Sequence, residues 1–274
     1  MVNPVAYASS NTLQQCNVSA IMDEFADELE TLNGKCMDIG CGPGDITRNI
    51  VLPALSPTAV MIGTDISEDM IQYANEKYGD NVRTAFEVLD VQTKFLPKEY
   101  VSEFDHIFSF HALHWCSDIR QAFSNIYEML QPGGTILMNL VASHDIFDVF
   151  NQISQNPRYA SYIPDKKRLV SPFQYSTEPQ KELKNMLKSV GFDVLHCSHR
   201  ETTYLHVNSH TFLPAIMSFI SFLDNMPKNL KTDFYEEFKS EYMQRKVIFK
   251  RRQNNEEQTV ILDMYRVLVL YAKK

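Results

Sequence analysis

A glycine-rich loop at residues 38–44 (DIGCGPG) is the part of the chain best suited to hold a ligand. It follows a short apolar run and precedes a helical stretch, as nucleotide-binding loops of parallel sheets do. Gly40 and Gly42 allow the backbone to turn tightly and to approach a ligand at the carboxyl edge of a sheet. Asp65 ends the next apolar run, where a carboxylate can accept hydrogen bonds from both hydroxyls of a ribose. The spacing therefore predicts a nucleoside-binding site.

Acidic residues around this loop argue against a dinucleotide. Asp38 and Asp45 flank the loop and would repel a pyrophosphate, and the dinucleotide fingerprint needs Gly or Ala where Asp45 stands. The same carboxylates suit a ligand with a cationic amino group and no phosphate, such as S-adenosylmethionine. Asp90 ends a third apolar run and is placed to hydrogen-bond an adenine amino group, with the backbone N–H of Val91 beside it. Each aspartate alone could merely form a turn, but together they predict one cofactor site.

The elements that must position these residues alternate between apolar runs and helical stretches. Helical patterns occur at residues 12–32, after the glycine loop, at 67–78 with Ser67 as N-cap, and at 117–130. This alternation predicts a doubly wound α/β fold with a mostly parallel sheet and helices on both faces. The expected strands are residues 36–39, 59–65, 85–89, 104–110 and 135–141.

The pattern changes after residue 142. Residues 192–207 and 259–272 are long strand candidates, which we interpret as an antiparallel pair at the edge of the sheet. The residues between them are helix-like and rich in aromatic side chains. We therefore expect one domain over residues 1–274, with a core sheet at about 34–142 plus the two edge strands. The rest of the chain is expected to form a helical cap: residues 1–32, 143–190 and 208–257.

The composition narrows the classes of partner and compartment. The formal net charge of −8 repels phosphate backbones and anionic lipid, which argues against nucleic acid or a membrane surface as the main partner. A basic run at residues 245–252 is interpreted as a solvated helix end or loop. No apolar run is long enough to cross a bilayer, and the N-terminus lacks the regions of a signal peptide. Five cysteines without C-x-x-C spacing suit a reduced compartment, so we expect a cytoplasmic protein. A homodimer is one assembly that the sequence leaves open.

The chain resembles class I S-adenosylmethionine-dependent methyltransferases in its glycine loop, in Asp65 and in the stretch at residues 130–134 (LQPGG). Over nearly its whole length it resembles the insect juvenile hormone acid methyltransferases. It departs from that family at Pro43, His111 and Ala112. The matching stretches are residues 7–14 (YxxxNxxQ), 65–75 (DISEDM followed by YAN), 104–110 (FDHIFSF), 113–115 (LHW), 146–149 (IFDV) and 171–173 (SPF).

This resemblance implies a cofactor, a substrate and further site residues. The family methylates the carboxylate of farnesoic acid or juvenile hormone acid, so it implies an isoprenoid carboxylic acid as the small-molecule partner and S-adenosylmethionine as the cofactor. By position, Gln14 and Trp115 match residues implicated in holding the acceptor carboxylate. Ile66, Met70 and Ser109 lie in matching stretches and are expected at the cofactor.

Methyl transfer to a carboxylic acid needs little acid–base chemistry. Such an acid has a pKa of about 4–5 by analogy with Asp and Glu, so it is ionised at pH 7 and requires no general base. Gln14 and the indole N–H of Trp115 are neutral donors, which orient a carboxylate without lowering its nucleophilicity as an arginine would.

Two other functions stay open at this point. One keeps the methyltransferase but changes the acceptor to another small acid, a phenol or an amine; a phenol or amine would need a base, for which His114 is the candidate. A fold relative could also bind the cofactor or a lipid without turnover. His111 and His114 have no acidic or cysteine partner at ligand spacing, so no metal site is expected.

Overall fold

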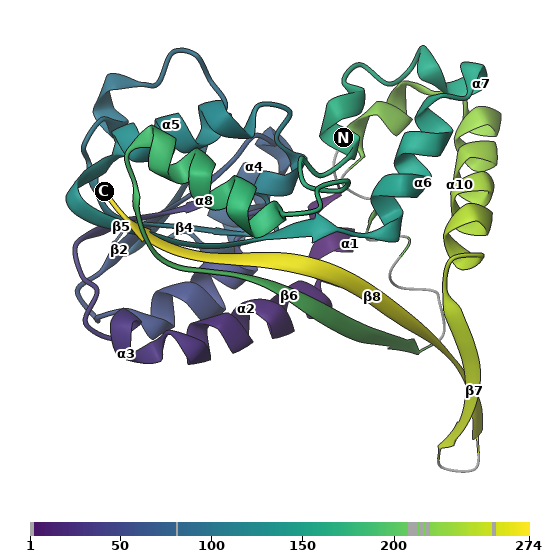
Figure 1. The fold of residues 1–274 in the computed structure, drawn as a ribbon, viewed down its shortest axis with the longest axis horizontal. Coiled ribbons are helices and arrows are strands. Elements are labelled where there is room, and N and C mark those ends of the chain that lie inside the picture. Colours follow the sequence, from purple (N-terminus) through teal and green to yellow (C-terminus); the bar gives the residue numbers. More distant parts are fainter. Residues whose placement is uncertain (1–2, 81, 208–212, 214–215, 218–219, 254–255) are drawn as a thin grey trace.

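One mixed sheet forms the centre of the molecule in the computed structural model, which describes residues 3–80, 82–207, 213, 216–217, 220–253 and 256–274 (Figure 1). In the described part, the strand order is β3-β2-β1-β4-β5-β8-β6, and β7 pairs with β8. Strands β1 to β5 run parallel, whereas β8 runs antiparallel to β5, β6 and β7. The predicted doubly wound fold and antiparallel C-terminal pair are confirmed. The strands are β1 (Lys35–Ile39), β2 (Val60–Asp65), β3 (Thr84–Val88), β4 (Phe104–Phe110), β5 (Leu130–Ser143), β6 (Asp193–Val207), β7 (Val247–Gln253) and β8 (Glu256–Lys273).

The order of the strands reverses between β3 and β4. The chain moves outward from β1 through β2 to β3, and then returns to place β4 on the other side of β1. The loops that follow β1 and β4 therefore diverge, which leaves a crevice at the carboxyl edge of the sheet. Asp65 ends β2 at this edge, and Asp90 follows β3 there.

Helices bury both faces of the sheet. Side chains alternate along β4, so that Ile107 joins one apolar cluster and Phe108 the other. No helix among the described residues is long and apolar enough to span a membrane. The helices α2 (Thr12–Glu24) and α3 (Ala26–Leu29) lie on one face, and α5 (Ile119–Met129) and α8 (Pro179–Val190) on the other (Figure 1).

Two further helices, α1 and α4, begin at capping residues near the carboxyl edge. Helix α1 (Pro4–Ala8) has Asn3 as its N-cap, and the Asn3 side chain accepts a hydrogen bond from the backbone N–H of Ala6. Helix α4 (Glu68–Tyr78) begins after the predicted N-cap Ser67, whose hydroxyl accepts from the N–H of Met70 at 3.3 Å.

A group of helices forms the cap beyond the carboxyl edge. The rings of Phe150 and Phe238 pack with their centroids 4.7 Å apart, and the hydroxyl of Tyr159 donates to Glu237 at 2.7 Å. The three aromatic side chains, Phe150, Tyr159 and Phe238, belong to the apolar cluster that continues under α2, so the cap and the core share one hydrophobic interior. The cap contains α6 (Asp145–Ser154), α7 (Pro157–Ala160), α10 (Lys228–Met243) and the short 3-10 helices η5 (Lys166–Leu169) and η6 (Ser221–Asn225).

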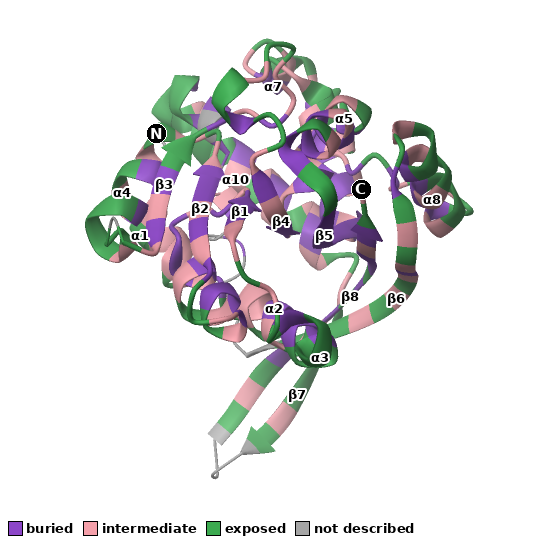
Figure 2. Cartoon of the chain, turned by 90° about the vertical axis from the view of Figure 1, so that its left-hand side faces the viewer, coloured by how far each residue is buried: buried purple, intermediate pink, exposed green. Residues whose placement is uncertain are grey.

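Strand β8 connects the core to an arm that projects from the body of the molecule (Figures 1 and 2). Its C-terminal part, from Arg266 to Lys273, pairs with β5 in the core. Its N-terminal part, from Glu256 to Leu262, pairs with β7. One continuous strand therefore belongs to both regions.

Two predicted elements are different in the structure. The helix expected at residues 12–32 stops at Glu24, because Phe25 leaves helical geometry and buries its ring beside His196 and Tyr271. The cap expected at 208–257 is not wholly helical, since β7 is a strand. Its side chains pair across to β8, with Lys250 bonded to Glu257 at 2.5 Å. Residues 208–212, 214–215, 218–219 and 254–255 of that cap lie outside the described residues.

The basic run at 245–252 was expected to be solvated, and this is wrong for one member. The side chain of Lys246 is only 1% exposed. Its ammonium lies between Asp145, at 2.8 Å, and the fully buried Asp263. A buried ammonium needs such paired carboxylates, because water is not there to solvate it.

Candidate active site

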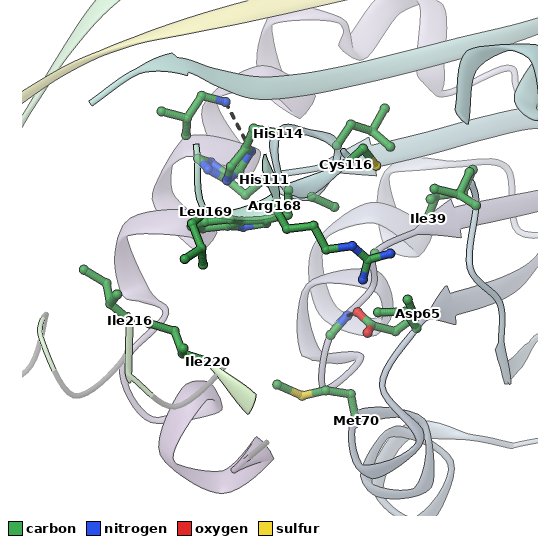
Figure 3. Close-up of a pocket in the computed structure, with 18 of the residues that line it drawn as sticks. Ile39, Asp65, Met70, His111, His114, Cys116, Arg168, Leu169, Ile216 and Ile220 are labelled. Atoms are coloured by element: carbon green, nitrogen blue, oxygen red, sulfur yellow. Dashed lines mark hydrogen bonds between the residues drawn. The ribbon is translucent and has the colours of Figure 1, made fainter. Parts of the chain in front are cut away.

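A cavity of about 590 Å³ opens at the carboxyl edge of the sheet (Figure 3). Its walls come from the loops after β1 to β4, from α1 and α2, and from cap residues around η5 together with Ile216, Ile220 and Phe222. Elements far apart in the sequence thus meet at one place. Most of the residues predicted for the site line this cavity: Gln14, Gly40, Gly42, Asp65, Ile66, Met70, Asp90, Val91 and Trp115.

The glycine loop has the tight geometry that its sequence predicts. Gly40 and Gly42 have φ values of 75° and 54°, which L side chains rarely adopt. A Cβ atom at Gly40 would lie 2.1 Å from the Cβ of Ala112. The backbone N–H groups of Gly40 and Cys41 both donate to the carbonyl of Thr64, at 2.7 and 2.9 Å. The loop is therefore fixed to β2 and packed against the segment after β4.

Asp65, which is half-buried, and Asp38, which is buried, place carboxylates on either side of this loop. Asp65 accepts hydrogen bonds from the backbone N–H groups of Gly42 and Ser67, at 3.0 and 2.9 Å. Asp38 lies outside the lining of the main cavity and borders a smaller one beside it, where it accepts from the hydroxyl of Thr47 at 2.6 Å. Burial raises the pKa of Asp65, and burial together with the nearby charge of Asp65 raises the pKa of Asp38 to about 7.

These carboxylates fit the cationic ligand that the sequence predicts. The groups that set the pKa values of Asp38 and Asp65 include no cationic side chain. Among the described residues, Asp38 and Asp65 are thus not paired with a cationic side chain. A ligand with an ammonium and a sulfonium would supply a counter-charge, and ribose hydroxyls would donate to Asp65. The donor set therefore fits S-adenosylmethionine.

Asp90 already has partners at the predicted adenine position. One carboxylate oxygen accepts from the backbone N–H of Gln92 at 2.9 Å, and the other lies 3.3 Å from the guanidinium of Arg168 in η5. The long side chain of Arg168 extends across the cavity toward the side where Asp65 lies (Figure 3). The carbonyl of Val91 accepts from Asn125 at 2.7 Å, which fixes the backbone beside Asp90. Arg168 therefore covers the place where an adenine amino group is expected.

The other predicted cofactor residues differ in exposure. Met70 is buried and Ile66 is half exposed, and both line the cavity. Ser109 is fully buried and lies outside the cavity lining, where its hydroxyl donates to the carbonyl of Ile39 at 2.9 Å. Ser109 thus supports the start of the glycine loop from behind, and a direct contact with the cofactor stays a prediction.

Helix α2 is fastened to the glycine loop beside Gln14. The side-chain amides of Asn11 and Gln15 both donate to the carboxylate of Asp45, each at 2.9 Å. This places Gln14 between the main cavity and the smaller one, since it lines both. The amide oxygen of Gln14 is buried and has no hydrogen-bond partner among the described residues. A buried orphan acceptor of this kind points to a ligand group that donates, whereas the amide nitrogen of the same side chain is the part that can donate to a carboxylate.

Trp115 and His114 lie in a short 3-10 helix, η4 (Leu113–Trp115), that follows β4. The indole of Trp115 packs on the rings of His114 and Phe147, with centroids 4.9 and 5.4 Å apart. His114 accepts the backbone N–H of Val141 at Nδ1, and burial lowers its pKa well below the usual value. In the described part of the chain, no group of three or more His, Cys, Asp or Glu side chains could hold a metal ion.

Tyr7 and Arg168 line the cavity, although no role was predicted for either. Burial raises the pKa of Tyr7, so its phenol stays protonated and can donate. The Asn3–Pro4 pair was a usable signal for Tyr7, because an N-cap followed by proline marks the start of a helix. Arg168 has no comparable signal, since its position depends on how the cap folds over the sheet.

Comparison with known sequences finds relatives that match over nearly the whole length of the chain. A methyltransferase domain family matches residues 37–136, which carry the glycine loop and the strand-end aspartates. The juvenile hormone acid O-methyltransferase of Drosophila melanogaster is 31% identical over 98% of this chain and 91% of its own length. The enzyme of the same name from Bombyx mori is 29% identical over 100% of this chain and 98% of its own length.

Solved structures share the fold at low sequence identity. A protein from Bacillus halodurans has a TM-score of 0.55 at 17% identity, and the match covers 93% of this chain and 99% of that one. The phosphoethanolamine N-methyltransferase 2 of Haemonchus contortus, solved with S-adenosyl-L-methionine, has a TM-score of 0.51 at 17% identity. That match covers 96% of this chain and 56% of the other.

Proposed function

Because the chain belongs to the juvenile hormone acid O-methyltransferase family of S-adenosylmethionine-dependent enzymes, we propose that it esterifies the carboxylate of an isoprenoid acid. The acceptor is farnesoic acid or juvenile hormone acid, and the reaction serves juvenile hormone synthesis. The methyl group passes directly from the cofactor to the carboxylate, without a general base.

One observation carries this proposal: the two ends of the cavity differ in charge and polarity. The end beside the glycine loop holds the carboxylate of Asp65. The end under the cap is lined by aliphatic and aromatic side chains, among them Ile146, Phe147, Leu169, Ile220 and Phe222. An apolar wall of this kind suits a branched hydrocarbon chain, and its area contributes about 25 cal/mol per Å² that is removed from water.

The chain supplies positioning rather than acid–base chemistry at the junction of these two ends. S-adenosylmethionine, when bound, provides the methyl group on its sulfonium. Gln14 and Trp115 orient the acceptor carboxylate as neutral donors, and near-attack geometry of this kind can lower a barrier by roughly 7–11 kcal/mol. A charged donor would stabilise the ground-state carboxylate more than the transition state, in which its charge is partly lost.

The geometry of His114 favours an acid over a phenol or an amine. Its Nδ1 accepts the N–H of Val141, so the proton of the neutral ring is on Nε2. A nitrogen that carries a proton cannot remove one from a substrate. The base that a phenol or amine acceptor requires is therefore not provided by His114.

Incubation with labelled S-adenosylmethionine and a panel of acids, phenols and amines tests the proposal. We expect label in the methyl ester of farnesoic acid or juvenile hormone acid, and much less with short acids that cannot fill the apolar end. Transfer confined to a phenol or amine would contradict the carboxylate assignment. Cofactor binding without transfer to any acceptor would instead indicate a non-catalytic relative.

A further inference from the structure

His111, the first residue after β4, has an unusual backbone conformation. Its φ of 53° lies in the left-handed region, which a residue other than glycine rarely adopts. This conformation is held by the Asn139 side chain, whose amide oxygen accepts the backbone N–H of His111 at 2.9 Å. The ring that results lines both the main cavity and the smaller one, beside Gln14. Strain of this kind at a cavity wall points to a role for the side chain.

The same contact fixes which nitrogen of the His111 ring carries the proton. Because the Asn139 oxygen accepts the backbone N–H, the amide nitrogen of Asn139 must face the ring, and it lies 3.2 Å from Nε2 of His111. The amide nitrogen of Asn17 lies 3.5 Å from the same Nε2. Amide nitrogens only donate, so Nε2 accepts, and the single proton of the neutral ring is on Nδ1. Burial lowers the pKa of His111 to about 4, which keeps the ring neutral at physiological pH.

The Nδ1–H group that this leaves has no hydrogen-bond partner among the described residues. Because the buried side-chain atoms without a partner do not include Nδ1, this nitrogen is not fully buried. Since the ring lines the cavity, Nδ1–H is accessible to a bound ligand there. Figure 3 shows His111 next to His114, on the side of the cavity away from Met70.

We propose that His111 donates a hydrogen bond from Nδ1 to the carboxylate of the acceptor acid, as a third neutral donor beside Gln14 and Trp115. This inference rests on the proposed function, because it takes the acceptor to be a carboxylate. A carboxylate has two oxygens, and donors on one of them leave the other free to attack the methyl group. Asn139 is the positioning residue that keeps the donor proton on Nδ1.

Kinetics with farnesoic acid provide the first test. In His111→Phe an aromatic ring is kept but both nitrogens are lost. The value of kcat/KM should fall about tenfold to a hundredfold, as expected for the loss of a hydrogen bond to a charged group. The Kd of S-adenosylmethionine should stay within about twofold, as should kcat/KM in the control variant His199→Phe, at an exposed site on β6. His111→Asn keeps a neutral donor and tolerates the left-handed backbone, so it should recover most of the loss.

Asn139→Asp provides a second test that does not depend on removing the ring. The carboxylate can still accept the backbone N–H of His111, but it now accepts from the ring as well, which moves the proton to Nε2. Nitrogen NMR of labelled histidine should show the exchanged tautomer, and kcat/KM should fall at least as far as in His111→Phe. This variant remains informative if His111→Phe has a much lower melting temperature.

The outcomes separate this inference from the proposed function. A wild-type enzyme that transfers no methyl group to any isoprenoid acid overturns both. Wild-type turnover with unchanged kcat/KM in His111→Phe, or in Asn139→Asp with an exchanged tautomer, overturns the role of His111 alone. A specific loss with the acid, recovery in His111→Asn and unchanged cofactor binding together support it.

Discussion

The cofactor half and the acceptor half of the cavity are built in different ways. The cofactor half comes from the ends of consecutive parallel strands, and Gly40, Asp65 and Asp90 lie within one stretch of about fifty residues. The acceptor half combines α2, the segment after β4, the cap and, through Tyr265, strand β8. A short motif can therefore specify the first half, whereas the second exists only after the whole chain has folded.

The two halves also treat charge differently. The cofactor half holds the carboxylates of Asp38 and Asp65, which have no cationic partner among the described residues and so favour a cation. The acceptor half presents neutral donors and histidines whose pKa values burial lowers. The cation that lines the cavity in the described part of the chain, Arg168, is paired with Asp90, so that two ligands of opposite charge can be held in one cavity. The predictions below test this division, beginning with the largest effect.

Removing the Asp65 carboxylate should have the largest effect, and it should fall on the cofactor half. In Asp65→Ala a bidentate, charge-assisted contact to ribose is lost, which costs roughly 1.5–3 kcal/mol, or about 10- to 150-fold in the Kd of S-adenosylmethionine. Calorimetry measures this Kd, and the exposed neighbour Glu68 provides the control variant Glu68→Ala. An unchanged Kd in folded Asp65→Ala would remove Asp65 from the site.

Changing Gln14 should affect the acceptor half alone. Gln14→Ala should lower turnover about tenfold through the loss of one orienting hydrogen bond, while cofactor affinity stays nearly intact. Gln14→Arg should bind the acid at least as well and yet turn over more slowly, because the added charge stabilises the ground-state carboxylate. Cys16→Ala, at an exposed position of α2, is the matched control. Wild-type turnover in Gln14→Ala would contradict the proposed role of Gln14 in orienting the acceptor.

Cofactor affinity should depend on pH through Asp38. Its pKa is raised to about 7, so at pH 6 the carboxyl is mostly protonated and must release its proton when a cation binds. Affinity should therefore rise by up to about eightfold from pH 6 to pH 7.5. Calorimetry in buffers of different ionisation enthalpy would detect the released proton. Asp38→Asn should abolish the dependence, and an unaltered pH profile in that variant would assign the effect to another group.

Arg168→Ala should change cofactor affinity only slightly. Arg168 and Asp90 are 39% and 37% exposed, and an ion pair at such exposure contributes about 0–1 kcal/mol. If the adenine amino group takes the place of the guanidinium, the variant should bind S-adenosylmethionine up to about fivefold more tightly. A weaker affinity would mean that Arg168 contacts the cofactor itself.

The smallest expected effect is that of pH on methyl transfer. With saturating cofactor and acid, kcat should be flat from about pH 6 to pH 8, since the acceptor is already ionised and no base titrates. The depressed pKa of His114 agrees with this expectation. A rise in kcat with an apparent pKa of about 6.5, lost in His114→Ala, would identify a base and favour a phenol or an amine.

Most of the residues predicted for the cofactor meet at one end of the cavity, and the sequence could indicate this because its signals are local. A glycine loop and aspartates at strand ends need only the alternation of strands and helices to bring them together. It did not predict that Ser109 faces the back of the loop, because the two faces of a strand buried on both sides look alike in sequence. It also missed β7 and the buried state of Lys246, since a basic, aromatic stretch becomes a strand only when β8 is beside it. Arg168 was missed for the same reason, because its partner Asp90 is distant along the chain.

The continuity of β8 has a mechanical consequence for the entry of ligands. Its 18 residues span up to about 60 Å, and ladder hydrogen bonds hold it to β6 from Val260 to Lys273, to β5 from Arg266 to Lys273 and to β7 from Glu256 to Leu262. A strand held in this way resists bending, because bending it would break several of those bonds. Movement that admits a ligand is therefore expected in segments that line the cavity outside the sheet, among them η5 and α1. An isoprenoid tail longer than the cavity would be accommodated by displacing these segments while β8 keeps its position.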